Sequence, residues 1–335
     1  FAVLFIYQFT YAQKIPQEKI DELTLKLDAI CLPIKNAGIK VSCKVMHADF
    51  NKVMYELDPE ISMIPASITK IVVGVVAYAK LGANYSIPTV IYTDDNNYKD
   101  GVIDGNLYLK GYGDPDLNSG DIQTLADEIR KAGITKITGN IVADESYFDN
   151  VYKTLSGVYK GDTGPSYWPY VSALMLDKSS GAMSAGNLLS SSLSGYGVEV
   201  QGTVINGTTP EGAKEIVQLS HSIYDVLSYM LKESDNHSAI TIFKMLGAKY
   251  KNTPASLEDA QDVINSFLNE LGVDRYSYEI LEGSGLTRYN KVNAEMYMKM
   301  LKYMYDDRFV FDHFMNSLTI AGKDGTLRKR MIGTE

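Results

Sequence analysis

The alternation of apolar and polar positions divides the chain into a helical beginning, a strand-rich middle and a helical second half. Residues 16–37 repeat apolar side chains at helical spacing, whereas residues 40–46 and 52–57 alternate as strands do. Residues 65–81 are apolar on nearly every side, with a proline at the start and Gly82 just past the end. This pattern predicts a buried helix.

From about residue 85 the pattern changes to short β-like pieces separated by glycine-rich turns, with one predicted helix at 122–132. The predicted strands of this middle part are residues 88–93, 106–110 and 136–142. Helical spacing returns in residues 222–231, 239–246, 257–271 and 294–305. We therefore expect an α+β protein in which residues 13–84 and 216–335 form one domain and residues 85–215 form an inserted α+β domain.

Composition narrows the classes of partner. The 335 residues carry a net charge of −9, which argues against nucleic acid or an anionic membrane as the natural partner. Residues 1–12 form an apolar run that is too short to span a bilayer and ends in small residues. We interpret it as the remnant of a secretory signal, so the protein would be exported to the periplasm or the exterior of the cell envelope. A buried N-terminal strand is the alternative interpretation.

Cysteine and histidine are sparse. Cys31 and Cys43 could form a disulfide in an oxidising compartment, or remain two buried free thiols. The four histidines are scattered and show no metal-ligand spacing, so neither a metal site nor another cofactor is expected.

Ser67 and Lys70 stand three residues apart at the head of the predicted buried helix. That spacing puts both side chains on one helix face, within reach of each other. Burial of the amine disfavours its charged form, and an uncharged lysine beside a hydroxyl can accept the hydroxyl proton. The pair therefore predicts an activated serine nucleophile, although the S-x-x-K string alone occurs by chance in chains of this length.

A second polar cluster, Ser234-Asp235-Asn236, falls between two predicted helices. There a serine could relay a proton and an asparagine amide could hold a substrate carbonyl. The alternative is purely structural, because Ser, Asp and Asn all cap helix N-termini well.

Together the two clusters match the S-x-x-K plus S-D-N pattern of β-lactamases and penicillin-binding proteins. The chain resembles the class C low-molecular-mass penicillin-binding proteins, the D-alanyl-D-alanine carboxypeptidase/endopeptidase family of serine peptidases. Segments that are similar to this family, in the same order, are LKGYGDPDL (109–117), ITGNIVADESYFD (137–149), VSAL (171–174), ESDN (233–236), EGSGLTRY (282–289) and AGKDGTL (321–327).

The resemblance implies a role for each candidate residue. Ser67 would be the acylated nucleophile and Lys70 its base, Ser234 the proton shuttle and Asn236 a substrate ligand. The implied fold is a penicillin-binding/β-lactamase-like transpeptidase fold, in which a five-stranded antiparallel sheet with helices joins a helical lobe. The implied substrates are peptidoglycan stem peptides that end in D-Ala-D-Ala, and β-lactam antibiotics would acylate the same serine.

Two departures from the family pattern stand out. The third motif, K-T-G, is absent, and the nearest string is Lys323-Asp324-Gly325, which would put a carboxylate where the substrate carboxylate should bind. We expect the motif to follow Glu335 and both ends of the chain to be truncated. The insert is also shorter than is usual in the family, because Ser179-Ser180-Gly181 leads quickly into a predicted helix.

Other functions remain possible on the same residues. A β-lactamase or an esterase would keep the fold and change the reaction. A non-catalytic penicillin-sensing or wall-binding module would keep Ser67 but lose turnover. Trp168, the single tryptophan, is interpreted as a packing residue rather than a sugar-stacking one.

Overall fold

The computed structural model describes residues 15–333. The predicted signal remnant at residues 1–12 therefore lies outside the described residues. Within 15–333, no helix combines the length and the apolar character that crossing a membrane requires.

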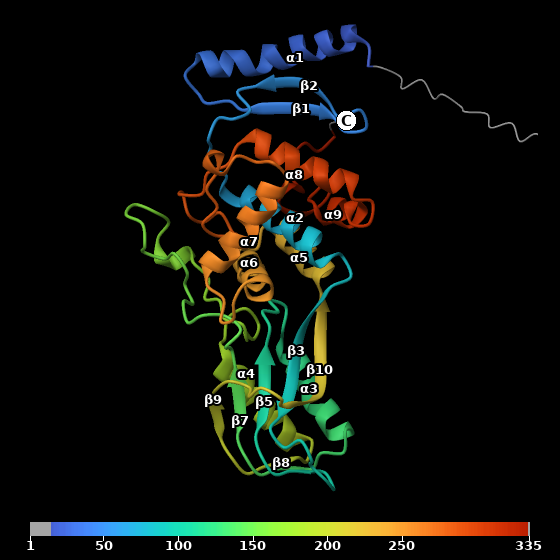
Figure 1. The fold of residues 1–335 in the computed structure, drawn as a ribbon, viewed down its shortest axis with the longest axis vertical. Coiled ribbons are helices and arrows are strands. Elements are labelled where there is room, and N and C mark those ends of the chain that lie inside the picture. Colours follow the sequence, from blue (N-terminus) through green and yellow to red (C-terminus); the bar gives the residue numbers. More distant parts are fainter. Residues whose placement is uncertain (1–14, 334–335) are drawn as a thin grey trace, which may run out of the picture.

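The N-terminal part forms a thin layer at one end of the molecule. Helix α1 (Gln17–Asn36) lies across the antiparallel pair of β1 (Cys43–His47) and β2 (Lys52–Leu57), with α8 (Ala294–Asp306) beneath them (Figure 1). These elements follow the predicted helix and strands to within three residues. Cys31 of α1 and Cys43 of β1 carry free thiols.

A bundle of helices makes up the centre of the molecule, and α2 (Thr69–Leu81) runs through it (Figure 1). The apolar sequence of α2 explains its position, because its four valines are fully buried. The helices packed around it come from the second half of the chain: α5 (Ile223–Glu233), α6 (Asn236–Tyr250), α7 (Leu257–Glu270), α8 and α9 (Phe311–Ser317).

The middle of the chain forms a mixed five-stranded sheet with the strand order β10-β3-β5-β7-β9. The strands are β3 (Ser86–Thr93), β5 (Leu107–Gly111), β7 (Ile141–Asp144), β9 (Val204–Asn206) and β10 (Lys214–Ser222). β10, β3 and β5 pair antiparallel, while β5, β7 and β9 pair parallel. Two helices, α3 (Ser119–Lys131) and α4 (Ala182–Gly195), pack against each other and against the sheet, and both enter the buried core of this unit.

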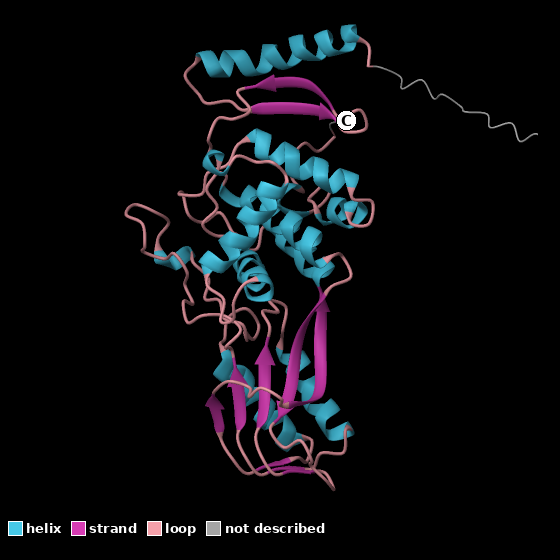
Figure 2. Cartoon of the chain, viewed as in Figure 1, coloured by secondary structure: helices cyan, strands magenta, loops and turns pink. Residues whose placement is uncertain are grey.

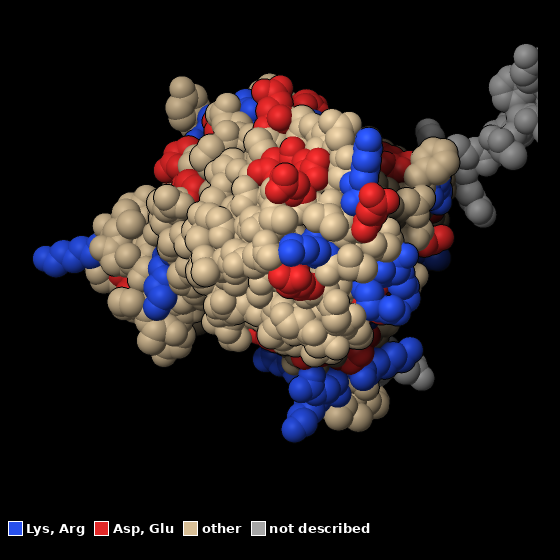
Figure 3. Space-filling view, turned by 90° about the horizontal axis from the view of Figure 1, so that it is seen from below, with Lys and Arg blue, Asp and Glu red and all other residues tan. Residues whose placement is uncertain are grey.

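A smaller sheet of β4 (Val102–Ile103), β6 (Lys136–Ile137) and β8 (Glu199–Val200) lies at the far end of the molecule. Figure 3 views that end and shows basic and acidic side chains interspersed over a largely uncharged surface. On this face the charges therefore do not gather into a field of one sign.

A long segment without regular helices or strands joins β7 to α4 (Figure 2). Its only helical piece is the 3₁₀ turn Pro165–Tyr167. Phe148, Trp168 and Val171 are buried in the same core as the central helices. Trp168 is 3% exposed and donates its indole N–H to the Thr163 carbonyl at 3.2 Å, which agrees with its interpretation as a packing residue.

The α+β class, the transpeptidase-like fold and the inserted sheet agree with prediction, but some details differ. The predicted strand at 136–142 is divided into β6 and β7, which belong to different sheets. Two antiparallel strands, rather than the five that the resemblance implies, lie beside α1 and α8 within residues 15–333. β10 and α9 were not predicted. β10 is an edge strand with four of its nine residues exposed, and its sequence lacks a clear apolar alternation. The domain limits at residues 85 and 215 stay a prediction.

Candidate active site

Ser67 lies on a 3₁₀ turn, Ala66–Ile68, that leads directly into α2. The turn is entered through Ala66, whose φ of 50° is left-handed and is uncommon for a residue with a side chain. Such strain persists only where the surroundings hold it, and it is typical of functional sites. Ser67 is exposed at the surface of the turn.

Lys70 lies one helical turn further on and is 2% exposed. Its ammonium group has three hydrogen-bond acceptors, one for each N–H. They are Ser67 Oγ at 3.1 Å, Asn236 Oδ1 at 2.8 Å and the Ser284 carbonyl oxygen at 2.7 Å. The spacing of Ser67 and Lys70 along the chain therefore brings the two side chains into contact, and Asn236 joins them.

Burial lowers the pKa of Lys70 to about 8, because the charged form is desolvated, while the carboxylates of Glu282 and Asp235 partly offset this effect. The direction is the one expected from the sequence. At pH 7 a pKa of about 8 leaves roughly a tenth of Lys70 uncharged. The lowered pKa therefore makes the uncharged amine, which can act as a base, accessible near neutral pH.

The Ser234-Asp235-Asn236 cluster connects α5 to α6. Ser234 ends α5 in the left-handed conformation, with a φ of 58°. Asp235 is the N-cap of α6 and accepts the Ser238 main-chain N–H at 2.8 Å, so the structural interpretation of this cluster holds for Asp235. Asn236 instead accepts a hydrogen bond from Lys70, which places its side chain beside the candidate base, and its role as a substrate ligand stays a prediction.

A cavity of about 360 Å³ lies over these residues. Ser67, Lys70 and Ser234 line it, together with residues 318–319 and 326–327. No hydrogen bond joins Ser234 to Ser67 or Lys70 within the described part of the chain. The string Lys323-Asp324-Gly325 leads into a 3₁₀ turn beside this cavity rather than into a strand.

The turn at residues 282–289 also belongs to the site, although in the sequence it stood out only as a segment similar to the family. Glu282 is fully buried, and its carboxylate accepts the main-chain N–H groups of Ser284 at 2.6 Å and Gly285 at 2.7 Å. Burial raises the pKa of Glu282, while these hydrogen bonds act in the opposite direction. A main-chain contact to Lys70 leaves no signal in side-chain identity, so the sequence alone did not bring this turn to Lys70.

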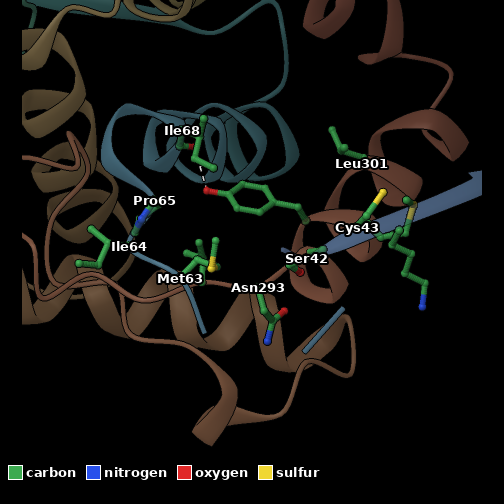
Figure 4. A pocket seen from close by; sticks show the side chains of 13 residues that line it. Ser42, Cys43, Met63, Ile64, Pro65, Ile68, Asn293 and Leu301 are labelled. Carbon is green, nitrogen blue, oxygen red and sulfur yellow. Dashed lines mark hydrogen bonds between the residues drawn. The ribbon is translucent and has the colours of Figure 1, made fainter. Parts of the chain in front are cut away.

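A second cavity, of about 440 Å³, lies between residues 63–68, β1 and α8 (Figure 4). Ile64, Pro65 and Ile68 line it, and Tyr297 donates its hydroxyl to the Ile68 carbonyl at 3.0 Å. Neither Ser67 nor Lys70 lines this cavity. We therefore assign the chemistry to the smaller cavity, where the polar groups converge.

The family model and two relatives that match this chain share one description, D-Ala-D-Ala carboxypeptidase. The model of the D-Ala-D-Ala carboxypeptidase 3 (S13) family matches residues 18–183 and 178–335. D-alanyl-D-alanine carboxypeptidase DacB of Haemophilus influenzae is 24% identical over 369 residues, which cover 88% of this chain and 76% of that protein. D-alanyl-D-alanine carboxypeptidase of Actinomadura sp. is 23% identical over 406 residues, which cover 94% of this chain and 74% of that protein.

Solved structures share the fold. The crystal structure of penicillin binding protein 4 (dacB) from Haemophilus influenzae matches with a TM-score of 0.70 at 22% identity, covering 86% of this chain and 80% of that one. The same protein in complex with a β-lactam matches with a TM-score of 0.67 at 23% identity, covering 93% and 82%. The chain therefore belongs to the D-Ala-D-Ala carboxypeptidase 3 (S13) family and is a serine-type carboxypeptidase of the penicillin-binding protein class.

Proposed function

We propose that this protein releases the terminal D-alanine from peptidoglycan stem peptides that end in D-Ala-D-Ala, with Ser67 as its nucleophile. One observation carries the proposal: Ser67 Oγ lies 3.1 Å from the amine of Lys70, which is buried and has a pKa lowered to about 8. Such an amine can accept the serine proton near neutral pH, which an exposed lysine cannot do to a useful extent.

Acylation follows from this pair. Ser67 Oγ attacks the carbonyl carbon of the penultimate D-Ala as its proton moves to uncharged Lys70, and the Ser67 main-chain N–H supplies half of an oxyanion hole, worth about 3 kcal/mol. The C–N bond then breaks, and Ser234 relays a proton to the leaving amine of D-Ala. Asn236 uses its Oδ1 for Lys70, which leaves its amide N–H groups to hold a substrate carbonyl.

Deacylation completes the cycle, because water attacks the ester on Ser67 and releases the shortened peptide. A β-lactam presents a strained amide to the same serine and would form a longer-lived acyl-enzyme. The match to a relative solved with a β-lactam supports this part of the proposal. Cell-wall substrates also require export, so we place the protein in the periplasm or at the exterior of the cell envelope.

Labelling with a fluorescent penicillin tests the assignment of Ser67. The wild type should be labelled and release D-Ala from a D-Ala-D-Ala peptide, whereas Ser67→Ala should do neither. Ser191→Ala is a matched control, since this exposed serine of α4 donates only to the Leu188 carbonyl. Persistent labelling of Ser67→Ala would refute the nucleophile. Fast nitrocefin turnover without D-Ala release would favour a β-lactamase, and labelling without any turnover would favour a penicillin-sensing module.

A further inference from the structure

Lys178 belongs to none of the motifs considered above, yet it contacts the loop that carries one of them. It follows the VSAL segment, in the short connection that leads to α4. Its Nζ donates to Asp235 Oδ2 at 3.2 Å and to Ser238 Oγ at 3.1 Å. The ammonium group therefore meets the N-cap of α6 at the residue that precedes Asn236.

Two further contacts hold the same ammonium group. Asp116, in the loop before α3, lies 3.4 Å from Lys178 Nζ. The ring of Tyr229, on α5, lies beneath the ammonium with its centroid 4.1 Å away. The five-stranded sheet together with α3 and α4 is called the sheet-bearing unit below. Lys178 connects this unit to α5 and α6, the helices on either side of the Ser234-Asp235-Asn236 cluster. Its side chain is 27% exposed.

The backbone at Lys178 is itself fixed. Asp177 and Lys178 both adopt left-handed conformations, with φ values of 52° and 54°. Asp177 donates its N–H to the Leu117 carbonyl at 3.0 Å, and its carboxylate accepts the Ser119 hydroxyl at 2.6 Å. These hydrogen bonds anchor the turn at the N-terminus of α3, so the backbone from which Lys178 extends is held in place.

The Asp235 carboxylate, which Lys178 contacts, belongs to the residue between Ser234 and Asn236. Asp235 sits between Ser234, which is left-handed without being glycine, and Asn236, which accepts a hydrogen bond from Lys70. Burial acts to raise the pKa of Asp235, but the hydrogen bonds from Ser238 and the charge of Lys178 outweigh it, and the pKa is lowered. A small shift of this carboxylate would move both neighbours relative to Lys70.

We propose that Lys178 is a positioning residue for the carboxypeptidase reaction: by holding Asp235 from the sheet-bearing unit, it sets the placement of Ser234 and Asn236 around Lys70. The inference rests on the proposed function, since it assumes that acylation occurs at Ser67. On this proposal the sheet-bearing unit helps to position the catalytic residues.

Substitution of Lys178 tests the proposal through rates of acylation. Lys178→Met should lower the rate constant for penicillin labelling and the kcat for D-Ala release by roughly tenfold to a hundredfold, because a misplacement of about 1 Å can cost about a hundredfold. KM should change less than kcat. Lys178→Arg keeps the charge and the contact with the Tyr229 ring, so its rates should stay within about threefold of the wild type.

Lys110→Met is the matched control. Lys110 lies in the same unit, forms an ion pair with Asp144 at 3.4 Å and has its Nζ 5.5 Å from the Tyr112 ring centroid, but it contacts none of residues 234–238. Its removal should leave the acylation rate within about twofold of the wild type. Equal losses in Lys110→Met and Lys178→Met, or wild-type rates in Lys178→Met, would overturn the proposal. If Lys178→Met does not fold, Lys178→Gln takes its place with the same expectations.

Hydrogen exchange separates this inference from the proposed function, because it does not depend on activity. In Lys178→Met the main-chain amide of Ser238, which is bonded to Asp235, should exchange faster than in the wild type and in Lys110→Met. Addition of Lys178→Met to Asp235→Asn should cause little further loss of acylation rate, since the two act as one unit. Unchanged exchange at Ser238, or additive losses in the double variant, would refute the coupling even where Ser67 is confirmed as the nucleophile.

Discussion

Lys70 Nζ donates a hydrogen bond to the main-chain oxygen of Ser284 at 2.7 Å, although 214 residues separate them in the chain. With Ser67 and Asn236, this carbonyl gives the lysine three acceptors, which match the three donors of an ammonium group. Loss of one proton leaves two donors and a lone pair, and the lone pair can then accept the proton of Ser67. The same three acceptors therefore suit both the protonated lysine and the deprotonated lysine that acts as the base.

The first prediction concerns the pH dependence of acylation. Because burial lowers the pKa of Lys70 to about 8 and the uncharged amine is the base, the rate constant for penicillin labelling should rise with pH and level off above about pH 8. Below that pH the rate should fall about tenfold per pH unit. Stopped-flow labelling between pH 6 and pH 10 measures this profile, and a flat profile would contradict the role of Lys70.

The second prediction concerns Glu282, whose carboxylate raises the pKa of Lys70 and so opposes the effect of burial. Replacement by glutamine removes this charge, so the midpoint of the pH profile in Glu282→Gln should move to lower pH. The variant should also unfold more easily, by about 1–3 kcal/mol, because an amide cannot accept all the N–H groups that the carboxylate accepts.

Glu279→Gln is the control for Glu282→Gln. Glu279 lies on the same stretch of chain, but its side chain is 43% exposed and pairs with Arg275. Its replacement should leave the pH midpoint unchanged. A shift of the same size in both variants would show that the effect does not come from the buried carboxylate.

The third prediction concerns Gly285, which has a φ of +79° and packs against the Ser67 turn. A Cβ at this position would lie 1.8 Å from the main-chain oxygen of Ala66, so Gly285→Ala should displace the turn and abolish penicillin labelling. Gly133→Ala matches the backbone strain, with a φ of +86°, but its Cβ would meet nothing within 4 Å. It should therefore keep its labelling rate and lose only about 1 kcal/mol of stability. Labelling of Gly285→Ala at the wild-type rate would refute the close contact.

The fourth prediction concerns His221 at the end of β10. Its Nδ1 lies 2.7 Å from Asp114 Oδ2, and the hydrogen bond and charge of Asp114, with further contributions from Asp121 and Asp116, raise the pKa of His221 to about 9. A raised pKa in the folded state means that the stabilisation is complete below about pH 6.5 and is lost as the pH rises through about 9.

The size of this effect is on the order of 1 kcal/mol, because the His221 side chain is 29% exposed and solvent screens the pair. Urea unfolding at several pH values should therefore show the wild type losing stability relative to His221→Gln between pH 6.5 and pH 9.5. A constant difference between the two proteins across that range would contradict a raised pKa.

Local patterns in the sequence determined the main helices and the pairing of Ser67 with Lys70. A helix that is apolar on every side must be buried, and a spacing of three residues on a helix fixes which side chains meet. The same reasoning located Ser234-Asp235-Asn236 between two helices. These features depend on neighbours within a few residues, so no knowledge of the tertiary fold was needed.

The tertiary structure alone decided which distant groups complete the site. The contacts of Lys70 with Asn236 and Ser284 span 166 and 214 residues, and one of them uses a main-chain atom that has the same chemistry in every residue. The ion pair of Lys178 with Asp235 likewise cannot be inferred from the sequence, because only the fold brings these two parts of the chain together. The edge strand β10 was not predicted, because it forms a strand through its pairing with β3 and its own sequence shows no strand pattern. The periodicity of a sequence reflects which side of a helix or strand is buried, whereas tertiary packing decides which distant residues each side chain contacts.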